Sequence, residues 1–348
     1  MLLAGEYAIT REGGIGIALA LAPRAVVRLS ARVTPESVQR FRRALYALES
    51  GKMQSIGGLR LESRAGAPEG TSPPILPPVL REITNFIRHT GYRAQGELPT
   101  SLEPTTIVID TSRFFDPVTG LKLGFGSSGA AMVLLTAALL HLAGVDPLGN
   151  RNTLLSVAVR AHRAFQGGRG SGYDVACSTM GGMLRFIGGE VPRWERLQVL
   201  RKWRDEGLRL YTLQVGTPVS STRAVAAFDR RFPSGHEAEA FLVRSNEAVD
   251  KLIRARTWRQ LTEAVAYARD VSRVIGDAIG VPAELPPGLT GDDRSWTAKT
   301  SGAGDEQAIV LARSDAGRAA ASPLPEGLRE LQLQPEGFRA ERDGEEGP

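Results

Sequence analysis

The residues best suited to chemistry form a glycine-serine loop, "GFGSSG", which leads directly into a long apolar stretch. Gly124, Gly126 and Gly129 permit backbone conformations and close approaches that a side chain would forbid. Ser127 or Ser128 can cap the first turn of the helix that follows. Free backbone N–H groups and the positive end of a helix dipole converge at such a point. The loop therefore predicts either an anion site or a tight turn with a serine cap.

The apolar stretch after the loop could be a membrane span or a buried helix. It is at the lower limit of length for a span, contains Thr136 and His141, and is rich in glycine and alanine. In a chain of otherwise ordinary composition, a helix that is apolar on all faces is typical of a protein core. We therefore expect a buried helix with the loop at its N-terminus.

The loop matches neither of the two common nucleotide-binding patterns. A P-loop needs a lysine after its glycines, whereas Lys122 precedes the first one. The glycine spacing also differs from that of a dinucleotide fingerprint. If an anion binds, a phosphate chain with Mg²⁺ is favoured, because a serine hydroxyl at a helix start can share the metal with phosphate oxygens.

The elements that must position this loop alternate irregularly between strands and helices. Strand patterns occur in "GIGIALALA", "AVVRLSARV", "PTTIVIDTS", "GMLRFIGG", "LRLYTLQVG", "QAIVLA" and "LRELQLQ". Helix patterns occur in "PESVQRFRRALYALES", "PPVLREITNFIRHTG", "NTLLSVAVRAHRAFQ", "EAEAFLVRSNEAVDKLIRA" and "TWRQLTEAVAYARDVSRVIGDAIG". "TAKTSGAGDE" is interpreted as a loop. The irregular alternation favours an α+β arrangement over a regular doubly wound sheet.

The length of 348 residues suits two domains of ordinary size. We expect the boundary in the polar segment "GGEVPRWERLQ", which gives domains at residues 1–190 and 191–341. Residues 342–348 are polar and are expected to form a disordered tail.

Composition disfavours several classes of protein. The net charge is +5, but the arginines are scattered over helical faces, which disfavours nucleic-acid binding. The single cysteine, Cys177, rules out an intrachain disulfide framework and fits a reducing compartment. Glu6 stands where a secretory signal needs an apolar core. We expect a cytoplasmic protein that binds neither nucleic acid nor a membrane, and the oligomeric state stays open.

Three segments together resemble the motifs of the GHMP small-molecule kinases, a superfamily that includes galactokinase, homoserine kinase and mevalonate kinase. "GFGSSGAA" resembles the second motif, usually P-x-x-x-G-L-G-S-S-A-A, while "LAGEYAI" resembles the first and "AKTSGAG" the third. They occur in the family's order and span nearly the whole chain. The resemblance implies an N-terminal domain like ribosomal protein S5 domain 2 and a ferredoxin-like C-terminal domain.

Within the superfamily the phosphomevalonate kinases are most similar, through "AHRAFQGGRGSGYDVACSTMGG", "GTPVSSTRAV" and the position of Lys122. The resemblance implies that Lys122 and Asp174 lie at the reacting phosphates and that Ser127 or Ser128 touches Mg²⁺. The implied cradle for the ATP phosphates is Gly124, Gly126, Ser127, Ser128 and Gly129. The implied acceptor contacts are Glu6, Ser171, Ser220, Ser221, Arg223, Ser301, Gly302, Ala303 and Gly304.

The acceptor decides the roles of Lys122 and Asp174. A hydroxyl acceptor, as in mevalonate kinase, needs a proton acceptor, which would be Asp174. A phosphomonoester has a second pKa of about 6 and is already mostly ionised at neutral pH, so the main problem is to bring two anionic groups together. We therefore assign Lys122 to stabilising transition-state charge and Asp174 to positioning and charge organisation.

The chain departs from the family pattern at two points. The lysine of P-G-K-x-x-x-x-G-E would fall ahead of Met1, and the third motif, normally G-A-G-G-G-D, reads "GAGDEQ" and is two glycines short. The prediction is an ATP- and Mg²⁺-dependent phosphomevalonate kinase of the mevalonate pathway, acting on the small molecule 5-phosphomevalonate. The alternatives are another GHMP kinase, such as mevalonate kinase, and a nucleotide-binding pseudokinase.

Non-catalytic interpretations also stay open for single residues. Lys122 could be a solvated residue before a turn, and Asp174 could cap the following helix. His162 is interpreted as a core histidine and Cys177 as a small buried side chain.

Overall fold

The computed structural model describes residues 1–64, 75–92, 101–120, 122–199, 203, 207–216, 219–304, 306–314 and 323–341. The chain divides into two compact units: unit 1 is Met1–Ala22, Arg169–Tyr173 and Gly181–Pro335, and unit 2 is Pro23–Gly168, Asp174–Met180 and Glu336–Pro348. The chain enters each unit more than once, so no single cut in the sequence separates the two units. The division expected at residue 190 stays a prediction, and the tail expected at 342–348 lies outside the described residues.

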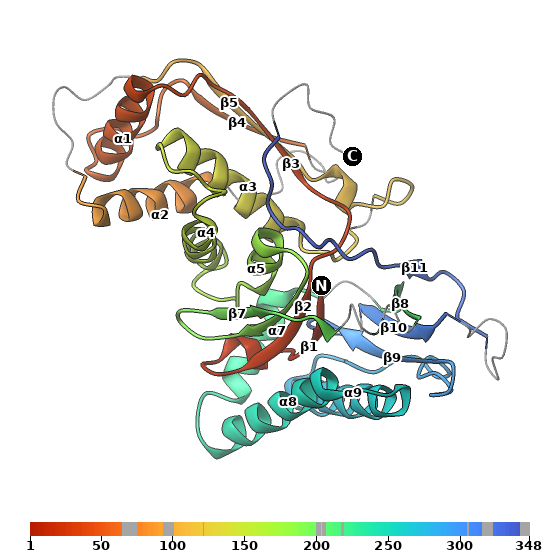
Figure 1. The fold of residues 1–348 in the computed structure, drawn as a ribbon. Helices are drawn as coiled ribbons and strands as arrows, with labels where there is room; N and C mark the ends of the chain where they lie inside the picture. Colours follow the sequence, from red (N-terminus) through yellow and green to blue (C-terminus); the bar gives the residue numbers. More distant parts are fainter. Residues whose placement is uncertain are drawn as a thin grey trace. The chain divides into compact units, whose positions relative to one another are not determined.

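Unit 2 contains a three-stranded sheet in the order β3-β5-β4 (Figure 1). β3 (Val26–Ser30) is antiparallel to β5 (Thr105–Asp110), whereas β4 (Leu59–Arg64) is parallel to it. Alternate residues of β5 are buried, so one face of the sheet belongs to the core. The short helix η2 (Ser112–Phe114) follows β5.

Helix α3 (Ser127–Leu142) is the centre of unit 2. It contacts β3, β5 and the helices α1 (Pro35–Glu49), α2 (Leu76–His89) and α4 (Arg151–Phe165). Most of its side chains are buried, around its whole circumference. The prediction of a core helix is therefore confirmed. Across the described ranges, no helix is both long and apolar enough to cross a membrane.

Unit 1 contains two antiparallel four-stranded sheets (Figure 1). The first has the order β1-β2-β6-β7, formed by Leu2–Ala4, Ile15–Leu19, Met183–Ile187 and Arg193–Arg196. The second has the order β11-β8-β10-β9, formed by Arg329–Glu330, Leu208–Gln214, Gln307–Arg313 and Trp296–Ser301. The short helix η1 (Ala8–Thr10) joins β1 to β2.

Among the described residues, unit 1 also contains the helices α7 (Ser221–Arg231), α8 (His236–Arg254) and α9 (Trp258–Ile279). Helix α8 packs on α9 and on β2, while α9 packs on β9. Helix α5 (Tyr173–Met180) begins in unit 1 and continues as part of unit 2. Mixed helices and largely antiparallel sheets confirm the expected α+β class.

One expectation about local structure is wrong. Residues 297–301 of the expected loop "TAKTSGAGDE" lie in β9. The buried polar residues Thr297, Lys299 and Thr300 hide this strand, because they remove the apolar alternation. The polar segment "GGEVPRWERLQ" contains strand β7, which pairs with β6.

Candidate functional site

The glycine-serine loop begins α3 through left-handed glycines. The φ angles of Gly124 and Gly126 are 70° and 81°, a region that L side chains rarely adopt. Gly126 is the N-cap, and no side chain forms a capping hydrogen bond. The predicted serine cap is therefore wrong, since Ser127 is already the first helical residue. The N–H groups of the first turn are left for another acceptor.

Asp174 packs against the first turn of α3. A Cβ atom on Gly129 would lie 2.6 Å from Oδ2 and 2.8 Å from Cγ of Asp174. A Cβ atom on Gly126 would lie 3.5 Å from the Cβ of Asp174. Position 129 therefore has room only for glycine, and the carboxylate lies at the positive end of the α3 dipole.

Two further groups contact the same carboxylate. The backbone N–H of Val175 donates to Oδ1 over 3.0 Å, and His162 Nδ1 lies 3.7 Å from the same oxygen. The side chain of Asp174 is 19% exposed, whereas that of His162 is 2% exposed. The carboxylate is thus contacted from three sides and still reaches solvent.

Lys122 precedes the loop on an anchored backbone. It forms an isolated antiparallel bridge with Phe115, and the next N–H, of Leu123, donates to the carbonyl of Phe114 over 2.9 Å. The Lys122 side chain is exposed and has no acidic partner among the described residues. Its ammonium group is available to an anion at the loop.

Oxygen donors dominate the first turn of α3. The Ser127 and Ser128 hydroxyls and the Asp174 carboxylate are the hard donors that Mg²⁺ prefers. In the part of the chain that the structure describes, no group of three or more His, Cys, Asp or Glu side chains could hold a metal ion. A donor set of this kind fits an ion bound mainly through phosphate oxygens, with few protein ligands.

Cys177, on the same helix as Asp174, is a buried free thiol. Burial, with the charge of Asp174 adding, raises the pKa of the thiol to about 12. The interpretation of Cys177 as a small buried side chain is therefore confirmed, and the thiol is unreactive at neutral pH.

In unit 1, three polar contacts join the third motif to the N-terminal segment that includes the first motif. The Tyr7 hydroxyl donates to the carbonyl of Ala303 over 2.9 Å, and the Ser301 hydroxyl donates to the carbonyl of Leu2 over 2.7 Å. Lys299 Nζ lies 2.5 Å from Glu6 Oε1. These contacts fix the start of the third-motif loop on the N-terminal strand.

The Lys299–Glu6 ion pair is buried, with side-chain exposures of 0% and 8%. Lys299 also donates to the carbonyl of Thr300, and the Ser272 hydroxyl donates to Glu6 Oε2 over 3.5 Å. Such additional hydrogen bonds are what a buried ion pair needs to offset its desolvation. The expected acceptor contact at Glu6 stays a prediction, but its carboxylate already has these two partners.

Tyr7 has a strained backbone next to this pair. Its φ angle is 61°, and its ring stacks on Phe228 with centroids 5.3 Å apart. Burial, with the charge of Glu6 adding, raises the pKa of the Tyr7 phenol. The phenol therefore remains a hydrogen-bond donor to Ala303.

The start of α7 packs beside the third motif. The Ser220 hydroxyl caps α7 by accepting the Arg223 N–H over 3.4 Å. A Cβ atom on Gly304 would lie 2.9 Å from Val219 Cγ2, and the Val219 N–H donates to Glu306 Oε2 over 3.3 Å. Tyr7 and Phe228 share a hydrophobic cluster with Val219 and Ala303.

The predicted acceptor residues are therefore partly brought together. Those near the third motif and the start of α7 lie in one region of unit 1: Glu6, Ser220, Ser221, Arg223, Ser301, Gly302, Ala303 and Gly304. Ser171 also belongs to unit 1, where it is buried and accepts the Tyr173 N–H over 3.4 Å. It is not part of the hydrophobic cluster.

Sequence reasoning missed two of these contacts. Lys299 carried a signal, because it is one of only five lysines and stands beside a glycine-rich loop. The pairing of His162 with Asp174 carried none, since a histidine on the apolar face of a helix is typical of a core.

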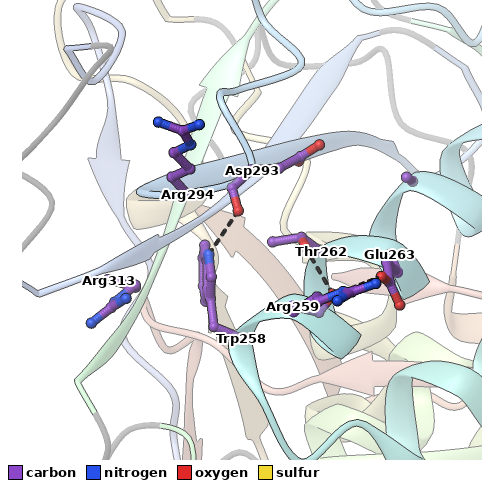
Figure 2. A pocket seen from close by; sticks show the side chains of 8 residues that line it. Trp258, Arg259, Thr262, Glu263, Asp293, Arg294 and Arg313 are labelled. Atoms are coloured by element: carbon purple, nitrogen blue, oxygen red, sulfur yellow. Dashed lines mark hydrogen bonds and ion pairs between the residues drawn. The ribbon is translucent and has the colours of Figure 1, made fainter.

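A separate pocket of about 520 Å³ lies at the other end of the β9–β10 hairpin (Figure 2). The hairpin turn joins Ser301 to Gln307, whereas the pocket is near the Trp296–Ala312 pair. Its lining includes Trp258, whose indole N–H donates to the Asp293 carbonyl over 3.0 Å. The pocket is therefore distinct from the third motif.

The fold and the loop define an α+β protein in which a glycine-rich turn opens a buried helix, an arrangement suited to phosphate chemistry. Residues 97–182 match the sequence profile of the GHMP kinases N terminal domain. This stretch, which contains the glycine-serine loop and Asp174, is therefore similar to the N-terminal domain of the GHMP kinases.

Solved structures with the same fold have low sequence identity to this chain. The Lin0012 protein from Listeria innocua is 20% identical, with a TM-score of 0.63 over 89% of this chain and 88% of that one. Phosphomevalonate kinase from Streptococcus pneumoniae, solved with phosphomevalonate and AMPPNP, is 17% identical, with a TM-score of 0.59 over 90% and 89%. Mevalonate kinase from L. major, solved with R-mevalonate, is 16% identical, with a TM-score of 0.53 over 97% and 94%. No curated protein matches the sequence.

Proposed function

We propose that this chain is an ATP- and Mg²⁺-dependent kinase that phosphorylates 5-phosphomevalonate to 5-diphosphomevalonate in isoprenoid-precursor synthesis. The observation that carries the proposal is the environment of Asp174. Its carboxylate lies at the N-terminus of α3, where it packs on Gly129, accepts the Val175 N–H and faces His162. A carboxylate fixed at a helix N-terminus can organise charge beside bound phosphates, and a phosphomonoester acceptor needs no base.

The loop would bind the phosphates of ATP. Gly124 and Gly126 leave the backbone open to close approach, and the uncapped N–H groups of the first turn of α3, that of Gly129 included, would donate to phosphate oxygens. The hydroxyls of Ser127 and Ser128 would hold Mg²⁺ together with those oxygens. When bound, the metal neutralises part of the phosphate charge.

Lys122 would supply positive charge to the transition state. Its ammonium is exposed, has no acidic partner in the described chain, and stands on an anchored backbone two residues before Gly124. Arg223 and the hydroxyls of Ser171, Ser220 and Ser221 would contact the acceptor, since guanidinium and hydroxyl groups suit a phosphate and a hydroxy acid. Residues 301–304 would contribute backbone donors. These are the features by which the chain resembles phosphomevalonate kinases.

A substrate screen tests the proposal. We expect ADP release with phosphomevalonate in a coupled assay, and little with mevalonate or homoserine. Good turnover of mevalonate with none of phosphomevalonate would instead assign a hydroxyl acceptor. ATP binding in calorimetry without turnover of any acceptor would assign a pseudokinase.

The ranking of two variants separates the acceptor types independently. For a phosphate acceptor, we expect Lys122→Ala to lower kcat by about 100-fold or more and Asp174→Asn to lower it less. For a hydroxyl acceptor the order reverses, because the carboxylate is then the base. ATP affinity and the circular dichroism spectrum of each variant control for folding.

A further inference from the structure

His162 is a buried titratable side chain for which the proposed mechanism has no role. It lies on α4 with 2% exposure, and its Nδ1 is 3.7 Å from Asp174 Oδ1. Its ring lies nearly parallel to that of Phe165, at 13° and 6.4 Å between centroids. The packing of α4 thus fixes which edge of the imidazole faces Asp174.

The other ring nitrogen, Nε2, is buried and has no hydrogen-bond partner among the described residues. A buried unpaired polar atom costs about 1–3 kcal/mol, so it needs an explanation. A proton on Nε2 would leave a buried donor unpaired and direct the lone pair of Nδ1 at a carboxylate. A proton on Nδ1 directs an N–H at the carboxylate and leaves only an acceptor unpaired. The Asp174 carboxylate therefore selects the form that is protonated on Nδ1.

We propose that His162 is a positioning residue that holds the Asp174 carboxylate on the first turn of α3 through its Nδ1–H. On its Gly129 side the carboxylate packs against helix backbone without a side-chain partner, and the Val175 N–H is a neighbour on the same helix as Asp174. Among the described residues, His162 is the side chain that reaches the Asp174 carboxylate from another element. Without it, the carboxylate can rotate away from α3.

The distance of 3.7 Å between His162 Nδ1 and Asp174 Oδ1 is slightly longer than a hydrogen bond. Contacts of this kind in free enzymes often shorten when ligands bind. We expect the His162–Asp174 contact to close when phosphates occupy the loop, because Asp174 then has to keep one orientation beside other anions. The effect on turnover rests on the proposed function, whereas the contact itself does not.

Nitrogen-15 NMR tests the contact without any activity. The chain has only four histidines, so their ring signals can be assigned. We expect His162 to carry its proton on Nδ1, and Asp174→Asn to shift the His162 ring nitrogens while leaving those of exposed His141 unchanged. A proton on Nε2 that is insensitive to Asp174→Asn overturns the proposal.

Three variants of His162 test the positioning role. His162→Asn keeps an N–H near the place of Nδ1, His162→Gln places one near Nε2, and His162→Leu keeps only the volume. We expect His162→Leu and His162→Gln to lower kcat by about 10- to 100-fold with little change in the KM for ATP. His162→Asn should recover most of the lost kcat, and His141→Asn is the matched control on an exposed histidine.

The outcomes of this experiment separate the two proposals. Equal losses in all three variants, in proportion to their losses of thermal stability, would show that His162 only fills space. If the wild-type protein turns over no acceptor, the proposed function fails. The NMR result then decides alone whether His162 holds Asp174.

Discussion

The glycine-serine loop of unit 2 and the third-motif region of unit 1 are both glycine-rich, yet they use their polar groups in opposite ways. At the start of α3, no side chain caps the helix, and Lys122 has no acidic partner among the described residues. In unit 1, Lys299 is paired with Glu6, and Tyr7 donates to Ala303. One region leaves its donors available, and the other uses them to hold its own backbone.

This difference teaches which residues to associate with ligand binding and which with structure. Polar groups without partners in the protein contribute most to ligand binding, because the ligand replaces only water and no hydrogen bond within the protein has to break. Buried polar groups that already satisfy one another contribute to a fixed conformation instead. The loop of unit 2 is therefore the region where anion binding is expected, and the unit 1 contacts form a scaffold.

The largest expected effect is on the scaffold. Lys299→Met leaves the carboxylate of Glu6 buried without its ion-pair partner, which should lower the free energy of unfolding by about 3–5 kcal/mol. Urea unfolding measures it. Because Gln at position 6 can still bond to Ser272, the double variant Lys299→Met/Glu6→Gln should recover part of the loss. Arg259→Ala, which breaks an exposed ion pair with Glu263, should leave stability unchanged. A small effect of Lys299→Met would mean that the buried pair does not hold this region.

The next effect is on the loop, and it should appear in activity rather than stability. Gly129→Ala places a Cβ atom 2.6 Å from Asp174 Oδ2 and must displace the carboxylate. We expect kcat to fall by about 100-fold, while the melting temperature changes little, since alanine is the better helix former. Steady-state kinetics and thermal unfolding measure the two quantities.

Gly149→Ala is the matched control for that variant. Its Cβ atom would lie 2.5 Å from the Oδ2 of Asp146, another glycine-carboxylate contact in unit 2 but on an exposed turn. We expect wild-type turnover. If Gly129→Ala were equally active, the packing of Asp174 on α3 would be irrelevant to catalysis.

The pH dependence of the free energy of unfolding should test the buried contacts around Tyr7 in unit 1. The pKa of Tyr7 is raised by burial and then by the charge of Glu6, so the folded state favours the neutral phenol. This contribution to stability is complete below the unfolded pKa of about 10 and is lost as the pH rises above it. Denaturant unfolding from about pH 8 to pH 11 should show a fall in stability that Tyr7→Phe reduces. Tyr267→Phe, at a less buried phenol whose pKa is also raised, should reduce it less. Identical slopes in all three proteins would contradict this assignment.

The regular elements were largely predictable from sequence because their signals are local. The apolar stretch after the loop is long enough to be a core helix on pattern alone, and glycines mark where the loop must turn. The helix start was not predictable in detail, because a serine and a left-handed glycine are both common N-terminal residues and stand side by side here.

The site contacts could not be predicted, because they join residues that are distant in sequence. Nothing local shows that Asp174 lies on Gly129, or that Lys299 pairs with Glu6. Strand β9 was missed for the same reason, since its buried polar residues acquire partners only in the folded sheet.

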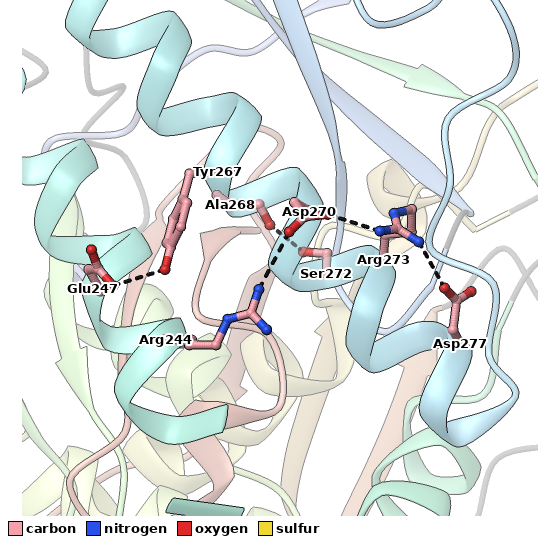
Figure 3. A network of polar contacts seen from close by, with 8 residues as sticks. All are labelled: Arg244, Glu247, Tyr267, Ala268, Asp270, Ser272, Arg273 and Asp277. Carbon is pink, nitrogen blue, oxygen red and sulfur yellow. Dashed lines mark hydrogen bonds and ion pairs between the residues drawn. The ribbon is translucent and has the colours of Figure 1, made fainter. Parts of the chain in front are cut away.

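The smallest expected effect is in the exposed ion-pair network that joins α8 to α9 (Figure 3). Asp270 accepts from Arg244 over 3.4 Å and from Arg273 over 3.0 Å, and the three side chains are 44–49% exposed. The network lies near Ser272, whose hydroxyl reaches Glu6. If the network oriented α9 for the contact between Ser272 and Glu6, breaking the network would lower stability as much as Lys299→Met.

Because water screens exposed ion pairs, we expect Asp270→Asn to change the melting temperature by no more than about 2 °C, with normal turnover. Ser272→Ala, which removes the buried hydrogen bond, should cost more, and the reverse order would mean that the surface network, not the buried pair, fixes α9 in unit 1.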